Sequence, residues 1–563
     1  MNSFRYKFLL IIFFAFVFFP FKGEATVLDF NVDSDYDYKG RSEITAFLNK
    51  IGEHAYFFVE DNYYNSLSAD NKKIFSDSIK ALSDEFDNVI YPQLTALYGY
   101  EWKPGIDNDD RITVLLSKFN TNSGGYFYSG DEYPVAQVMN SNEREMIYFN
   151  VDYVSDPLAK SYLAHEFMHL INFNQKERSY GVEEDVWLNE GRAEMASTLL
   201  GYDDVYNNSA LQKRVKTFLQ NPSDSLTEWK GDVADYGVLN IFMQYLVDHY
   251  GSKILVDSLN SSKTGIDSLN YALIKNGYEE NFYQVFSNWT IALLVNDCSL
   301  GEIYCFYRDG LTNLKVIPRL NYLPMSGEST LTMTDYSKNW TSNWIKFIGG
   351  NGTLELEFVG DERTTFKVPY VIKNSNGTYS IGYFNLDGTT TGKIYIENFG
   401  NIYDSITIIP SIQGEIRGFN NLENYYKFIW SASILNENSN DNENLVSQLT
   451  AQIEYLKNEI AKVQAQIAAI LNQKSSCQFD NNLYYGMSNN NDVECLQQFL
   501  KNQGSEIYPE GIVTGNFYDL TLQAVVRFQE KYASEILYPV GLQKGTGFVG
   551  VMTRDKINQL LGN

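Results

Sequence analysis

The chain has 563 residues, of which 44% are hydrophobic and 15% aromatic, so it is long enough for several packed domains. Its formal net charge is −26, with 70 acidic against 44 basic residues. This acidic balance argues against nucleic acid as a partner. It fits a soluble protein outside the cell, although such a charge is usually only a solvated surface.

The N-terminus has the pattern of a secretory signal peptide. Arg5 and Lys7 precede an apolar run over residues 8–21, and the small residue Ala25 follows shortly afterwards. We therefore expect residues 1–25 to be removed and the protein to be secreted or held at the cell surface. A retained N-terminal anchor is the alternative, although the run is short for a full membrane span.

The four cysteines indicate disulfide bonds, because an even number in an exported chain is typical of a disulfide framework. They fall in two separated pairs, which predicts the bonds Cys298–Cys305 and Cys477–Cys495. None has a histidine close by in sequence, so a cysteine protease is disfavoured.

Residues 165–169 read H-E-x-x-H, a pattern typical of a metal site on a helix. His165 and His169 would lie one turn apart on the same face, where they could share one metal ion. Glu166 would lie beside the open side of that ion, where a general base belongs. Glu190 is the candidate third ligand, which leaves the fourth position of zinc open. The alternative is a surface helix with two incidental histidines.

The longer pattern resembles a known group of enzymes. H-E-x-x-H followed by N-E-x-x-x-E resembles the gluzincin metallopeptidases, the thermolysin-like clan, and W-L-N-E-G also resembles the aminopeptidase N family. Residues 164–171 together with 187–196 most resemble the hyicolysin family of secreted bacterial metallopeptidases. The resemblance implies His165, His169 and Glu190 as zinc ligands and Glu166 as the base.

The resemblance also bears on neighbouring residues. In thermolysin-like enzymes an acidic residue one turn after the ligand glutamate holds a ligand histidine, which implies this role for Glu194; an exposed helix carboxylate is the alternative. In the aminopeptidase-like branch a tyrosine at a helix start donates a hydrogen bond to the oxyanion, and Tyr236 is the candidate here among 42 tyrosines. His249, near the end of the same helix, is interpreted as a capping or surface residue.

One departure from the clan favours an endopeptidase over an exopeptidase. Aminopeptidases of the clan carry a G-x-M-E-N motif that captures the free amine of the substrate. No such motif precedes His165 in this sequence.

Residues 26–310 are predicted to form the α+β thermolysin-like zinc metallopeptidase domain, with active-site helices over roughly 157–173 and 185–201. We expect the strand over 146–151, or its neighbour, to bind peptide through backbone hydrogen bonds; a plain core strand is the alternative. The acidic residues 107–110 could bind Ca²⁺, because hard cations take clustered oxygens, and a solvated turn is the alternative.

Three further segments follow. Short alternating runs separated by Asn-Gly and Asp-Gly turns predict an all-β sandwich over residues 311–435. Residues 436–475 read as a polar linker and a coiled coil, with a heptad seam from Val446 to Ile470. The coiled coil could associate chains, or a single amphipathic helix could pack against its own chain.

Residues 476–563 are predicted to form a small three-helix domain. The near repeat that opens at Thr514 and again at Thr546 resembles the peptidoglycan-binding-like domain, which implies attachment to the cell wall. The expected protein is thus multidomain: a secreted or surface-attached zinc endopeptidase acting on protein or peptide substrates. A non-catalytic cell-wall-binding surface protein and a zinc-dependent peptidoglycan hydrolase remain as alternatives.

Overall fold

The computed structural model describes residues 26–324, 329–414, 423–435, 457 and 477–562. By its internal contacts the chain divides into two compact units, Met1–Asn440 and Asp441–Asn563, each described by itself below. The predicted signal peptide and nearly all of the predicted coiled coil lie outside the described residues. Among the residues that are described, no helix is long and apolar enough to cross a bilayer.

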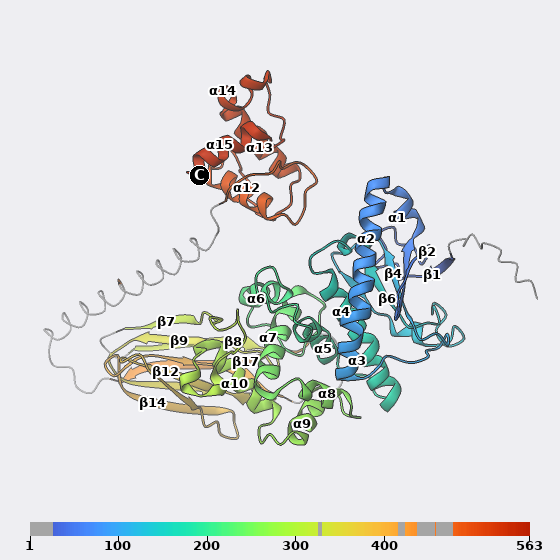
Figure 1. The fold of residues 1–563 in the computed structure, drawn as a ribbon. Helices are drawn as coiled ribbons and strands as arrows, with labels where there is room; N and C mark the ends of the chain where they lie inside the picture. The colour runs from blue at the N-terminus through green and yellow to red at the C-terminus, as the bar shows by residue number, and fades with distance from the viewer. Residues whose placement is uncertain (1–25, 325–328, 415–422, 436–456, 458–476, 563) are drawn as a thin grey trace, which may run out of the picture. The chain divides into compact units, whose positions relative to one another are not determined.

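The N-terminal unit begins with a six-stranded sheet (Figure 1). Its strand order is β1-β2-β3-β4-β6-β5. Its strands are β1 (Val27–Asn31), β2 (Glu43–Ile51), β3 (Ala55–Glu60), β4 (Ile112–Ser117), β5 (Gly125–Tyr126) and β6 (Met146–Asn150). Strands β3, β4 and β6 are parallel neighbours, whereas β5 pairs antiparallel with β6 and ends the sheet.

Successive side chains of the central strands enter two different cores. In β4, Val114 and Leu116 belong to the core shared with the helices, while Leu115 belongs to the core on the opposite face. This period of two follows from strand geometry. Both faces are covered, which explains why every residue of β4 and of β6 is buried and why their sequences are mainly apolar.

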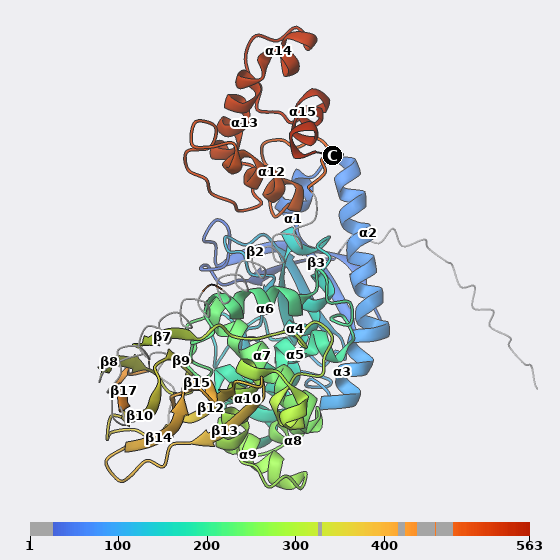
Figure 2. The same cartoon turned by 90° about the vertical axis from the view of Figure 1, so that its left-hand side faces the viewer.

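The helices of the N-terminal unit are α1 (Asp61–Ser66), α2 (Ala69–Glu85), α3 (Tyr91–Tyr98), α4 (Ala159–Asn172), α5 (Val186–Leu199), α6 (Ala210–Gln220), α7 (Val233–Tyr250), α8 (Lys253–Leu259), α9 (Gly265–Lys275) and α10 (Phe282–Val295). Of these, α1, α2 and α4 contact strands of the sheet, and α10 contacts β12 of the strand-rich part of the unit described below. Ile79 of α2 and Phe167 of α4 lie in the same core as Val114. Figure 2 shows α2 running along the sheet. Helix α5 contacts both α4 and α7, so one core fixes the three helices relative to the sheet.

The remainder of the N-terminal unit is made of strands. They are β7 (Arg319–Leu323), β8 (Ser329–Ser337), β9 (Ile345–Gly349), β10 (Gly352–Val359), β11 (Phe366–Lys367), β12 (Pro369–Asn374), β13 (Tyr379–Tyr383), β14 (Thr391–Phe399), β15 (Tyr403–Ile408), β16 (Ser411–Ile412) and β17 (Tyr426–Leu435). The main path runs β13-β12-β15-β14-β10-β17-β8, and β9 joins β15 to β7. Alternate residues of β10, such as Leu354 and Leu356, are buried in a core that also holds Phe347 of β9 and Trp430 of β17.

Two tryptophans connect the strand region to the helices. Trp340 and Trp344 lie in the helical core rather than in the strand core. The indole Nε1 of Trp344 donates to the carbonyl oxygen of Thr290 in α10 at 3.0 Å. The strand region therefore packs directly on the helical region within one unit. The predicted disulfide Cys298–Cys305 is confirmed and lies just after α10.

The C-terminal unit contains α12 (Asn491–Asn502), α13 (Asp519–Lys531), α14 (Ala533–Ile536) and α15 (Val551–Leu561). The second predicted disulfide, Cys477–Cys495, is also confirmed. The near repeat has a physical basis, because two glutamines bind equivalent loops. The Oε1 atom of Gln497 accepts from the amides of Thr514 and Gly515, and that of Gln529 accepts from Thr546 and Gly547, which lie 32 residues later.

Candidate active site

Helix α4 carries the H-E-x-x-H motif with one face in the core and the other in a cleft. Phe167, Met168 and Ile171 are fully buried among the sheet-facing residues. His165, Glu166 and His169 line a cleft of about 600 Å³. The two imidazole rings have centroids 5.0 Å apart. The spacing of four residues thus puts both histidines on one helix face, as the sequence predicts.

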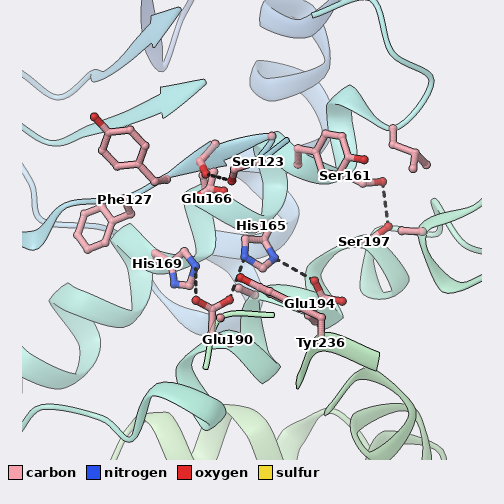
Figure 3. A pocket seen from close by; sticks show the side chains of 18 of the residues that line it. Ser123, Phe127, Ser161, His165, Glu166, His169, Glu190, Glu194, Ser197 and Tyr236 are labelled. Carbon is pink, nitrogen blue, oxygen red and sulfur yellow. Dashed lines mark hydrogen bonds and ion pairs between the residues drawn. The ribbon is translucent and has the colours of Figure 1, made fainter. Parts of the chain in front are cut away.

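Helix α5 returns past α4 and brings Glu190 to the same point. Its Oε2 atom lies 3.2 Å from Nε2 of His165, and its Oε1 atom lies 3.8 Å from Nε2 of His169. Figure 3 shows the Glu190 carboxylate facing both rings. The three candidate ligands therefore converge, although twenty residues of sequence lie between His169 and Glu190.

The chemistry of this set fits a zinc ion. Ligand atoms of His165, His169 and Glu190 all lie within 4.8 Å of one another. Tetrahedral zinc with bonds of about 2.1 Å holds its ligand atoms roughly 3.4 Å apart, close to the two contacts measured here. The Oε2 atom of Glu190 is buried and accepts no hydrogen bond among the described residues, although Nε2 of His165 is near. A buried anionic oxygen without a donor is better satisfied by a cation shared with the histidines.

The second nitrogen of each imidazole faces an oxygen atom. Nδ1 of His165 lies 3.5 Å from Oε1 of Glu194, and Nδ1 of His169 lies 3.1 Å from Oδ1 of Asn189. Such partners hold the proton on Nδ1 and leave Nε2 free to bind a metal. Glu194, for which the resemblance implied contact with a ligand histidine, thus lies beside His165. Asn189 has the matching contact on the other histidine, a role that the sequence analysis did not assign.

Glu194 is itself held by two side chains from other helices. Arg214 of α6 donates from Nε and Nη2 to the two carboxylate oxygens at 2.7 and 2.6 Å. Nδ2 of Asn240 in α7 donates to Oε2 at 3.1 Å. Burial would raise the pKa of Glu194, but Arg214, together with His165 and Asn240, outweighs it and the pKa is lowered. Glu194 thus stays ionised next to His165.

Glu166 lies against the edge of the sheet. It is buried, and Cγ of its side chain is so close to Gly125 that a Cβ atom there would lie 2.7 Å away. Burial raises the pKa of Glu166 to about 8. Because Gly125 has no side chain, the side chain of Glu166 can occupy this space.

Tyr236 begins the second turn of α7 and lines the cleft. Its ring lies 6.4 Å from that of His165 and 4.9 Å from that of Trp229, and the Arg214 guanidinium lies 4.6 Å from its centroid. Burial raises the pKa of Tyr236, so the hydroxyl keeps its proton at neutral pH and can donate it in a hydrogen bond. Tyr36, from the N-terminal segment, also lines the cleft. No motif in the sequence indicated that it would lie there.

The edge strand β5 borders the cleft. Residues 121–127 line it, and β5 pairs with β6 only on one side within the described sheet order. This is the neighbour of the strand at 146–151 for which peptide binding was expected.

The other sequence hypothesis, calcium at residues 107–110, gains no support. The carboxylates of Asp107 and Asp109 accept backbone amides of Asp109 and Arg111.

Comparison with known proteins yields one informative relative. The chain is 30% identical over 249 residues to neutral metalloprotease ShpI of Staphylococcus hyicus. The match covers 39% of this chain and 52% of the relative, so the chain spans about half the length of the curated protein it matches. This similarity supports a relationship to metalloproteases. No family model matches the chain.

Two solved structures match with low TM-scores. A periplasmic inhibitor of g-type lysozyme from Aeromonas hydrophila matches at 9% identity with a TM-score of 0.14, covering 21% of this chain and 100% of its own. The pre-peptidase C-terminal domain of a collagenase from Bacillus anthracis matches at 7% identity with a TM-score of 0.13, covering 20% of this chain and 96% of its own. Scores this low carry no argument about fold or function.

Proposed function

We propose that the protein is a zinc-dependent endopeptidase of the gluzincin type. The observation that carries this proposal is the convergence of His165, His169 and Glu190 on one wall of a cleft that also contains Glu166 and an edge strand. The similarity to neutral metalloprotease ShpI supports the same reaction class. The lack of a G-x-M-E-N motif before His165 supports an endopeptidase.

The two Nε2 atoms and the Glu190 carboxylate would hold the ion. When bound, zinc supplies a Lewis acid that makes a water molecule more acidic and polarises the substrate carbonyl. Glu166 accepts the proton of the attacking water and later delivers it to the leaving amine. The Tyr236 hydroxyl donates a hydrogen bond to the carbonyl oxygen as negative charge develops there. Glu194 and Asn189 keep the ligand histidines in the required orientation.

The cleft also suggests how a peptide is held. A substrate in extended conformation can add to β5 as a further strand, with its backbone paired to residues near Gly125. Aromatic residues Tyr36, Tyr126 and Phe127 lie along this wall of the cleft and can contact substrate side chains. Secretion is part of the proposal and rests on the N-terminal sequence pattern alone.

The decisive variant is Glu166→Gln, which has nearly the same shape but cannot act as a base. We expect it to retain stoichiometric zinc and to lose casein cleavage by at least about a thousandfold. Glu53→Gln, an exposed change outside the cleft, serves as the matched control. Zinc analysis and casein turnover are measured on the same preparations. A zinc-loaded Glu166→Gln protein with wild-type turnover would rule out the proposed base.

A further inference from the structure

A second group of acidic side chains meets at the start of α7. Asp224 lies in the loop between α6 and α7, Asp232 is the N-cap of α7, and Asp235 lies in its first turn. One carboxylate oxygen from each lies within 4.8 Å of the other two. None of the three belongs to the candidate zinc ligands. The group contains only oxygen donors.

Two oxygen atoms of this group are buried without a hydrogen-bond donor. Asp235 is 1% exposed; its Oδ2 accepts from the amides of Lys230 and Asp232, but its Oδ1 accepts from none of the described residues. Asp224 is 8% exposed; its Oδ1 accepts from Nζ of Lys230 at 3.2 Å, and its Oδ2 likewise has no donor. Leaving a buried charged acceptor unsatisfied costs upward of about 1–3 kcal/mol per group. A cation shared by the carboxylates would satisfy both oxygens.

The local charge leaves room for a divalent ion. Asp224, Asp232 and Asp235 contribute −3, and Lys230 contributes +1, so the group carries −2. Glu228 also contacts Nζ of Lys230, at 3.1 Å, but it forms its own ion pair with Lys338. Asp232 is exposed, so the group is open to solvent on that side. An ion can thus enter, neutralise the excess charge and keep some of its water.

We propose that Asp224, Asp232 and Asp235 form a calcium-binding site. Calcium takes six to eight oxygen ligands with flexible geometry, and carboxylates with water and backbone carbonyls supply them. A set with no nitrogen or sulfur donor does not favour zinc. Magnesium demands a tighter octahedron and loses its water reluctantly, which disfavours it at a loop of mixed burial.

The site would fasten a loop that joins two parts of the unit. The Oγ of Ser225 donates to the carbonyl of Asn339, and the amide of Leu226 donates to the carbonyl of Trp340, both in the segment that connects β8 and β9. At its other end the loop leads into α7, whose first turns carry Tyr236. Bound calcium would hold Asp224 of the loop to Asp232 and Asp235 of the helix. Any effect on turnover through Tyr236 rests on the proposed function; calcium binding does not.

The test uses the full-length, zinc-loaded protein and reads binding rather than cleavage. Calcium is titrated after treatment with a calcium-selective chelator, and zinc content is checked before and after. Terbium serves as a luminescent probe of the same site, sensitised by Trp229, which lies next to Lys230 in sequence. We expect saturable terbium luminescence that calcium displaces, and an increase in Tm with calcium that equal magnesium does not reproduce.

Three variants locate the effect. Asp235→Asn removes a buried charge, and we expect it to weaken calcium binding at least tenfold. Asp232→Ser withdraws a carboxylate while keeping a good helix N-cap, so it folds even if Asp235→Asn does not. Asp110→Asn, in the exposed acidic loop at 107–110, is the matched control and should leave the titration unchanged.

The outcomes are distinct. Loss of terbium and calcium responses in Asp232→Ser, with the control unchanged, supports the site whether or not the protein cleaves casein. No saturable calcium response in the wild type, a response to magnesium alone, or an undiminished response in Asp232→Ser would overturn it. Loss of the response in Asp110→Asn alone would move the calcium site to residues 107–110.

Discussion

Gly125 lies directly against the side chain that we propose as the catalytic base, so Gly125→Ala tests the site without touching a metal ligand. A Cβ atom at this position would lie 2.7 Å from Cγ of Glu166, 2.9 Å from its Oε1 and 2.7 Å from the carbonyl oxygen of Tyr148. The backbone of Tyr148 is fixed in β6, which pairs with strands on both sides. Glu166 must therefore absorb much of the displacement.

The size of that displacement follows from ordinary contact distances. To restore a contact of 3.4 Å, Cγ of Glu166 has to move by about 0.7 Å. A misplacement of about 1 Å in a catalytic group can reduce turnover by about a hundredfold. We therefore expect kcat to fall roughly 10- to 100-fold. Overpacking should also lower the free energy of unfolding by about 1–3 kcal/mol.

The assay is casein turnover together with zinc content and Tm. Zinc should remain stoichiometric, because His165, His169 and Glu190 lie on helices and not on β5. Gly388→Ala is the control, since a Cβ atom there would meet nothing within 4 Å. Wild-type kcat in a stable, zinc-loaded Gly125→Ala protein would refute the argument that this glycine makes room for the base.

Three other predictions concern positioning, pH and the C-terminal unit. Arg214→Ala should weaken zinc binding by about 10- to 100-fold, because Glu194 loses its bidentate partner. Lys216→Ala, an exposed change on the same helix, is the control and should leave zinc affinity unchanged. Competition with a chelator measures the zinc affinity of both variants. Burial, with Glu145 alongside, raises the pKa of Glu132 above its unfolded value, so its contribution to stability is present below about pH 4.3 and is lost as the pH rises toward its folded pKa. Glu132→Gln should therefore raise the free energy of unfolding more at pH 8 than at pH 5, by about 1.4 kcal/mol for each pH unit in that interval that lies below the folded pKa. Chemical denaturation at the two pH values measures this, and an equal gain at both would contradict it. Gln529→Ala should lower the free energy of unfolding of the C-terminal unit by about 2–4 kcal/mol, because the amides of Thr546 and Gly547 lose their acceptor. Calorimetry should show one unfolding transition at a lower temperature. In the control Gln498→Ala, that transition should keep the wild-type Tm.

Local sequence spacing was enough to predict the central part of the site. His165, Glu166 and His169 lie within one helix. Helix geometry alone places residues four positions apart on the same face. The two disulfides were also predictable, since each joins cysteines only 7 or 18 residues apart. Glu190 required the further expectation of a second helix that returns to the first. The predicted coiled coil stays a prediction, as it lies outside the described residues.

Other contacts had no signal in the sequence. Arg214 binds Glu194 from a different helix and lies 20 positions away in the sequence. Asn240 also binds Glu194 and lies 46 positions away. Asn189 stood within the motif, so its position could have suggested a partner for His169. His249, interpreted as a capping or surface residue, is half-buried, and its Nε2 atom lies 2.9 Å from the carbonyl oxygen of Cys305, beside the disulfide loop.

The sequence by itself determined which residue types could hold a metal and act as a base, because that chemistry depends on side-chain identity and on spacing within one helix. Only the tertiary structure decided which distant groups orient those residues, where β5 leaves space for Glu166, and that Asp224 meets Asp232 and Asp235 at the start of α7. The physical reason is that these arrangements depend on how one core packs α4, α5, α6 and α7 against the sheet. Packing of that kind joins residues that no local periodicity relates.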